Sequence, residues 1–212
     1  GDSMLVLAYQ RMAQCRPDKL HEVITLFTET ALEIGEGQQY DMDCEHRDDV
    51  REEEYIEMIR LKTSVLLACA VKTGAILADA SPADADTLYR FGEKMGLAFQ
   101  LQDDFLDVYG DTKVFGKAIG GDIVSNKKTF MLINAFNRAD DRQLAELRKW
   151  VSATEFDPQE KIEAVTRLYN EMGIDRLAQE KIARYFDESR QCLDAVQVAA
   201  DRKRELALYT EQ

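Results

Sequence analysis

The chain has 212 residues, of which 45% are apolar and 32% are charged, a length and composition that fit a folded globular protein. It carries 27 Lys and Arg against 40 Asp and Glu, and the resulting net charge of −13 argues against a protein that binds nucleic acid through a basic surface. The longest apolar run, Val65 to Val71, is far shorter than the roughly 20 residues of a membrane span. We therefore expect a soluble, cytoplasmic protein without a transmembrane segment.

Apolar residues recur every three or four positions along most of the chain, which is the period of an amphipathic helix. This period predicts an all-α protein, with each of Pro17, Pro82 and Pro158 at the start of a helix. Two stretches, 35–54 and 110–126, are rich in polar residues or glycine and are predicted as connections. The predicted helices cover residues 2–15, 18–35, 52–78, 83–109, 127–138, 140–152, 159–171 and 174–207. Because no repeat or linker interrupts them, residues 1–212 are expected to form a single domain.

Three aspartates lie near the end of predicted helix 83–109. Asp103 and Asp107 are four residues apart, and Asp104 and Asp107 are three apart, so we expect their carboxylates to converge within one helical turn. Beside apolar neighbours such as Leu106, three carboxylates would repel each other unless a cation were present. The pattern predicts either a solvated helix end or a Mg²⁺ site, since Mg²⁺ uses one or two carboxylates together with water and substrate phosphates.

The segment that follows this helix favours the Mg²⁺ site. It combines glycines, which let the backbone approach an anion, with lysines, which contact phosphate as mobile charges. The lysines are Lys113, Lys117, Lys127 and Lys128. Another lysine, Lys62, lies on an apolar helix, where it either extends its amine to solvent or contacts an anion, and the segment favours the anion.

These residues carry a resemblance to a known family. Residues 96–107, with the sequence GLAFQLQDDFLD, resemble the second aspartate-rich region of the trans-isoprenyl diphosphate synthases, or polyprenyl synthetases. Upstream, residues 37–41 (GQQYD) are similar to the family's GQxxD motif, and Lys62-Thr63 is similar to its KT pair. The motifs run from the N-terminus to about Thr129, and beyond that only the helical pattern agrees.

The resemblance implies an antiparallel helical bundle of the isoprenoid synthase type. It also implies that Asp103, Asp104 and Asp107 hold Mg²⁺ on an allylic diphosphate. The residues implied to bind substrate are Gln38, Asp41, Lys62, Thr63, Phe99, Gln100, Lys117 and Lys127. Within that set, the catalytic role is implied for Lys62, Thr63, Gln100, Lys117 and Lys127.

The implied reaction is prenyl transfer. The allylic diphosphate ionises with the help of Mg²⁺ and lysines, the double bond of isopentenyl diphosphate attacks the allylic cation, and a proton is lost. The product is a longer trans-prenyl diphosphate, and the implied assembly is a homodimer.

The chain departs from the family in one large respect. The family has a first aspartate-rich region followed by Arg-Arg, and no segment of this sequence has that pattern. We therefore expect the N-terminal helices to be missing and the chain as given to be incomplete, with weak or no synthase activity. The alternatives that stay open are a non-catalytic prenyl-synthase subunit, a terpene-cyclase-like protein, and an acidic helical interaction protein.

Overall fold

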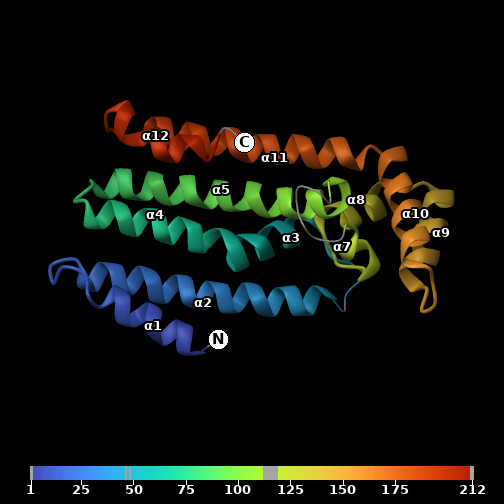
Figure 1. Cartoon of the computed structure of the whole chain (residues 1–212), viewed down its shortest axis with the longest axis horizontal. Helices are drawn as coiled ribbons and strands as arrows, with labels where there is room; N and C mark the ends of the chain where they lie inside the picture. Colours follow the sequence, from blue (N-terminus) through green and yellow to red (C-terminus); the bar gives the residue numbers. More distant parts are fainter. Residues whose placement is uncertain (1, 46, 48, 112–118, 211–212) are drawn as a thin grey trace. The chain divides into compact units, whose positions relative to one another are not determined.

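The computed structural model describes residues 2–45, 47, 49–111 and 119–210. All the regular elements in these residues are helices, which confirms the all-α prediction (Figure 1). In chain order they are α1 (Asp2–Met12), α2 (Leu20–Glu45), α3 (Glu52–Ile59), η1 (Arg60–Ser64), α4 (Val65–Leu77), α5 (Pro82–Tyr109), α7 (Gly121–Val124), α8 (Phe130–Arg138), α9 (Asp141–Ser152), α10 (Pro158–Glu171), α11 (Ile174–Ala195) and α12 (Ala200–Leu208).

The helices contribute to two compact units. Unit 1 comprises Gly1–Gln39, Ile59–Leu97 and Tyr185–Gln212, and unit 2 comprises Tyr40–Met58 and Ala98–Arg184. Because α2, α5 and α11 each contribute residues to both units, the boundary does not separate two successive stretches of sequence. The prediction of a single domain stays a prediction.

Local signals explain where several helices begin. Helix α5 starts at Pro82, where Ser81 Oγ accepts a hydrogen bond from the amide of Asp84 at 3.1 Å. Helix α10 starts at Pro158, and the carboxylate of Asp157 accepts from the amides of the second and third helical residues. A side-chain cap satisfies amides that would otherwise lack a partner at a helix start, and proline loses nothing there. Pro17, in contrast, lies in a turn three residues before α2.

Helix α2 is longer than predicted, because residues 35–45 continue the helix instead of forming a connection. The two glycines of this stretch have different surroundings. A Cβ at Gly35 would meet nothing within 4 Å, whereas a Cβ at Gly37 would lie 2.8 Å from the backbone carbon of Leu61. Gly37 therefore does not end the helix but lets α2 pack directly on the backbone of η1.

Predicted helix 52–78 forms as a continuous helical run with one irregular turn. The turn is η1, a π-helical segment in which Ser64 Oγ bonds the carbonyl of Ile59, five residues earlier, at 3.4 Å. Short π-helical turns inside α-helices occur frequently at functional sites. Helix α5 approaches this segment closely, since a Cβ at Gly96 would lie 2.5 Å from the Cα of Ser64.

The predicted helix 174–207 is wrong as one helix, because the chain leaves helical conformation after Ala195 and starts α12 at Ala200. At the break, the amide of Gln197 donates to Asp84 Oδ1 at 3.0 Å instead of to a carbonyl of its own helix. Arg190 on α11 then donates to the carbonyl of Thr210, just after α12. No glycine or proline marks this break, and the hydrogen bond from Gln197 to Asp84 is a tertiary contact found there.

In unit 2, α10 packs against α7, α8 and α9. Helix α7 belongs to the segment between α5 and α8, which carries the lysines that are predicted to contact phosphate, so α10 packs against part of that segment. Among the described helices, none combines the length and the apolar character required to cross a bilayer.

Candidate active site on helix α5

The three aspartates of α5 have different environments. Asp103 is exposed, Asp104 is buried with 2% of its surface accessible, and Asp107 is half-buried. Successive residues of an α-helix point about 100° apart, so Asp103 and Asp104 occupy different faces. Within the described residues no group of three or more His, Cys, Asp or Glu side chains could hold one ion. The three carboxylates do not form one ligand cluster in this arrangement, and the Mg²⁺ site expected from them stays a prediction.

Asp104 is held from both sides inside unit 2. Its Oδ2 accepts a hydrogen bond from the hydroxyl of Tyr55, a fully buried residue of α3. Its Oδ1 accepts from Gln100 at 3.3 Å and from the ammonium of Lys127 at 3.4 Å. Burial raises the pKa of Asp104, and Lys127 and the hydrogen bonds oppose that rise. Because both oxygens already have partners, Asp104 orients Lys127 rather than facing solvent.

Lys127 bridges two acidic residues. Its ammonium lies 3.4 Å from Asp104 Oδ1 and 3.3 Å from Asp122 Oδ2, while 39% of its side chain stays accessible. Burial lowers the pKa of Lys127, but the two carboxylates together raise it by more than burial lowers it, so the net shift is upward. Burial also raises the pKa of Asp122 to about 6. The result is an ammonium that two carboxylates hold in place, on a side chain that stays partly accessible to solvent.

Asp107 supports the segment that carries Lys127. Its Oδ2 accepts from the amide of Asp122 at 2.9 Å, and its carbonyl accepts from the amide of Gly120 at 2.6 Å. Gly120 has φ of 84°, a left-handed conformation that favours glycine. Asp107 thereby ties the end of α5 to the start of α7.

Apolar and acidic side chains share the exposed face of α5 in unit 2. Phe99 is 59% exposed, although a phenylalanine on an apolar helix is normally part of the core. Phe99 and Asp103 are four residues apart and lie on one face, whereas Gln100 and Asp104 form the next face and bond each other.

The remaining predicted site residues lie in several places. In unit 1, Gly37 packs on the backbone of Leu61 and Lys62, so the GQ motif and the KT pair are neighbours; Gln38 is exposed, and Lys62 and Thr63 are half-buried. Asp41 belongs to unit 2 and is half-buried. Lys113 and Lys117 lie outside the residues that the structure describes.

No sequence motif marks Tyr55 as part of the site. It is a helical tyrosine that shares an apolar face with Met58 and Ile59, and such positions are usually core. The available signal was its hydroxyl, since a buried tyrosine normally requires a hydrogen-bond partner.

The comparison with known families decides what these motifs belong to. Residues 1–172 match the family described as polyprenyl synthetase. The chain belongs to the polyprenyl synthetase family. Its fold is the helical fold of that family's solved members.

Relatives within the polyprenyl synthetase family are prenyl diphosphate synthases by name. A short chain isoprenyl diphosphate synthase from Methanothermobacter thermautotrophicus is 39% identical over 143 residues, which are 67% of this chain and 44% of that protein. A crystal structure of a geranylgeranyl pyrophosphate synthase has 37% identity and a TM-score of 0.92, and it matches 99% of this chain and 65% of its own. The matched part of this chain thus covers less than half the length of the curated relative from Methanothermobacter thermautotrophicus.

A second solved structure of the polyprenyl synthetase family includes ligands. It is a geranylgeranyl pyrophosphate synthase from Corynebacterium glutamicum complexed with isoprenyl diphosphate and magnesium, with 26% identity and a TM-score of 0.88, and it matches 99% of this chain and 60% of its own. In the present chain, the exposed carboxylate of Asp103 has the hard oxygen donors that Mg²⁺ prefers. The donor set fits an ion completed by water and phosphate, and among the described residues it does not fit a closed protein cage.

Proposed function

We propose that this protein is a trans-polyprenyl diphosphate synthase, a transferase of the EC 2.5.1 class. It joins an allylic diphosphate to isopentenyl diphosphate and yields a longer trans-prenyl diphosphate. Membership of the polyprenyl synthetase family supports this reaction over an unrelated acidic interaction protein.

One observation carries the proposal. On α5, an exposed aromatic ring, Phe99, lies one turn from an exposed carboxylate, Asp103. The adjacent face of α5 carries Asp104, which pairs with the ammonium of the partly accessible Lys127. A substrate with an apolar chain and a diphosphate requires this combination of an apolar wall, a metal-binding oxygen and a cation.

Each of these residues has a distinct task in the proposed reaction. Asp103 holds Mg²⁺, which when bound neutralises the diphosphate and stabilises it as a leaving group. The ammonium of Lys127 contacts the diphosphate and stabilises the charge that develops as the allylic bond breaks. Phe99 contacts the prenyl chain and excludes water, which would quench the allylic cation. Gln100 hydrogen-bonds Asp104 and thereby fixes the acceptor that orients Lys127.

Further roles are proposed on the family's motifs. We assign diphosphate contacts to Lys62 and Lys117 and contacts with the reacting chain to Thr63 and Gln38. The irregular turn η1, which presents Lys62 and Thr63, supports this assignment. Asp41 is proposed as a substrate-binding residue, and Asp104 and Asp107 as residues that support the Mg²⁺ site.

The proposed assembly is a homodimer in the cytoplasm. Exposed apolar side chains on α1 support the dimer, since Met4 is 75% exposed and Val6 is 67% exposed. The cytoplasmic location rests on the family alone.

The test is binding of a non-reactive allylic diphosphate analogue, compared with inorganic pyrophosphate, in calorimetric titrations with Mg²⁺. Wild type should bind both, and the analogue more tightly. Asp103→Asn should weaken both ligands, whereas Phe99→Ala should weaken only the analogue. Asp141→Asn, the same charge change on α9, is the control and should bind as wild type. Equal affinities of Asp103→Asn and wild type would refute the assignment.

A further inference from the structure

Lys161, on α10, is a fully buried lysine, with 0% of its surface accessible. It makes no ion pair with any described carboxylate, and burial lowers the pKa of its amine. A buried ammonium is costly unless its environment replaces the lost water. Two acceptors that bond the Lys161 amine replace that water, and an apolar side chain of the same volume would leave them without this donor.

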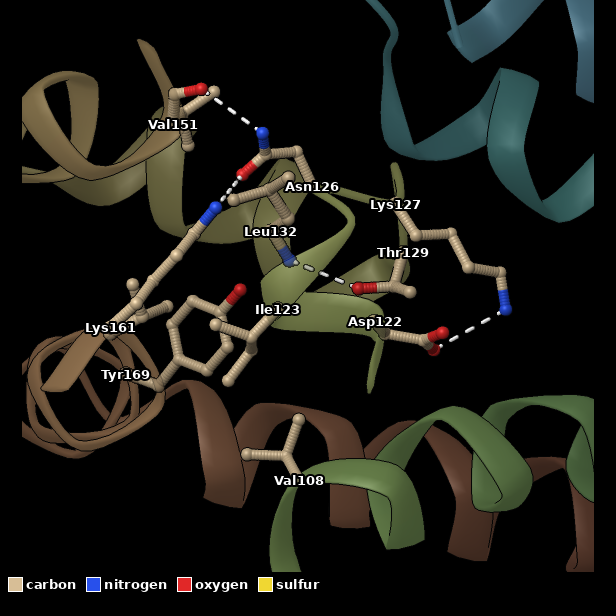
Figure 2. Close-up of a pocket in the computed structure, with 11 residues that line it drawn as sticks. Val108, Asp122, Ile123, Asn126, Lys127, Thr129, Leu132, Val151, Lys161 and Tyr169 are labelled. Carbon is tan, nitrogen blue, oxygen red and sulfur yellow. Dashed lines mark hydrogen bonds and ion pairs between the residues drawn. The ribbon is translucent and has the colours of Figure 1, made fainter. Parts of the chain in front are cut away.

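The two hydrogen-bond acceptors of Lys161 lie in the segment that precedes α8, and its aromatic neighbour lies in the connection between α9 and α10. Its Nζ donates to Asn126 Oδ1 at 2.6 Å and to the carbonyl of Val124 at 3.1 Å, and it lies 4.3 Å from the ring centroid of Phe156. Figure 2 shows the ammonium pointing at the amide of Asn126, which in turn reaches Val151. The Asn126 side chain donates to the carbonyl of Val151 at 3.0 Å.

These bonds fix the residue immediately before Lys127. Asn126 has φ of 57°, a left-handed conformation that non-glycine residues rarely adopt. Both polar ends of its side chain are engaged, which holds this conformation. From there the chain turns so that the side chain of Lys127 extends toward Asp122, away from Lys161 (Figure 2).

The cavity between these side chains does not function as a ligand site. Its volume is about 10 Å³, and its lining includes Lys161, Asn126, Tyr169 and Asp122. Pockets for small molecules have volumes of roughly 300–1,000 Å³. The cluster therefore acts on the backbone of the segment rather than on a bound molecule.

We propose that Lys161 is a positioning residue for Lys127: by anchoring Asn126 and Val124, it fixes the backbone from which Lys127 reaches Asp104, Asp122 and a diphosphate. This inference rests on the proposed function, because it assumes that Lys127 binds diphosphate. Lys161 itself touches no substrate.

The test is calorimetric titration with inorganic pyrophosphate and Mg²⁺ at a temperature where every variant is folded. Lys161→Met keeps the volume but removes the anchor, and we expect its affinity to fall roughly ten- to hundredfold, as for residues that orient ligating groups. The control is Lys149→Met, at an exposed position of α9. It removes the same charge and should bind pyrophosphate as wild type does. A wild-type affinity for Lys161→Met would overturn the inference.

A second variant separates positioning from general loss of structure. Asn126→Gly tolerates the left-handed conformation but removes the contact with Lys161. If both residues act through this one contact, the double variant should bind no more weakly than the weaker single variant. Fully additive losses in the double variant would contradict the inference. Absence of pyrophosphate binding by wild type would instead contradict the proposed function.

Discussion

Asp104 shows how one buried carboxylate organises the candidate site. Its two oxygens receive bonds from Tyr55, Gln100 and Lys127, so it links α3, α5 and the segment before α8. A carboxylate removed from water is stable only when such donors replace the solvent.

Removal of the Tyr55 hydroxyl tests this linkage. We expect Tyr55→Phe to lower the free energy of unfolding by about 2 kcal/mol, because one oxygen of a buried carboxylate loses its donor. Urea unfolding measures the change. Tyr40→Phe, the same substitution at a tyrosine that is 49% exposed, should leave stability unchanged within about 0.5 kcal/mol. Equal stability of both variants would show that Tyr55 does not support Asp104.

For single residues, the sequence predicts which residues belong to the candidate site better than it predicts where their side chains point. The motif identified Asp103, Asp104 and Asp107, but their spacing did not reveal that one faces solvent, one is buried and one ties down α7. Those directions depend on α3 and the segment before α8, which are distant in sequence. The bond from Tyr55 to Asp104 likewise joins residues that are distant in sequence.

Helix α2 shows how tertiary packing changes the meaning of a glycine. Gly35 and Gly37 both argue for a break by intrinsic propensity, yet the helix continues through both to Glu45. The polar composition of residues 35–54 predicts a connection, but the part up to Glu45 is helical, and an exposed helix has the same composition. The helix starts at Pro82 and Pro158 were predictable because their caps are local.

Paired substitutions test the two glycines. Gly35→Ala should raise the free energy of unfolding by roughly 1 kcal/mol, since alanine favours the helix and its Cβ meets nothing. Gly37→Ala should lower it by roughly 1–3 kcal/mol, because its Cβ would overlap the backbone of Leu61 and Lys62. Thermal or urea unfolding checks both. Stabilisation by Gly37→Ala would contradict the close packing of α2 on η1.

The start of α3 is predicted to be acid-sensitive. The guanidinium of Arg47 has the largest effect on the pKa of Glu54, and the amide of Arg51 has the next largest. Together they lower this pKa from its ordinary 4.5 to about 2. Because the folded-state pKa is the lower one, Glu54 contributes stability that is present above about pH 4.5 and is lost as the pH falls to 2.

Unfolding measured between pH 2 and pH 5 should therefore show a smaller acid-induced loss of stability in Glu54→Gln than in wild type. The neighbouring exposed residue provides the control, since Glu53→Gln makes the same charge change and should retain the wild-type pH dependence. Identical pH profiles for all three proteins would contradict the role of Glu54.

For the whole molecule, net charge and local charge have different consequences. The charge of −13 argues against a basic nucleic-acid surface, but it is no obstacle to an anionic substrate. Around Lys127 the acidic residues hold the cation in place, and the exposed Asp103 offers oxygen to a metal. The family and the all-α fold were predictable from motifs and helical period, whereas the break before α12 and the packing around Lys161 required the structure.

The most direct test of the account is titration of Lys127→Met with inorganic pyrophosphate in the presence and absence of Mg²⁺. Loss of one charged contact of about 1.5–3 kcal/mol predicts roughly ten- to hundredfold weaker Mg²⁺-dependent binding than in wild type. Lys149→Met should bind as wild type. Wild-type affinity in Lys127→Met, or binding that does not require Mg²⁺, would contradict a metal-diphosphate site on α5.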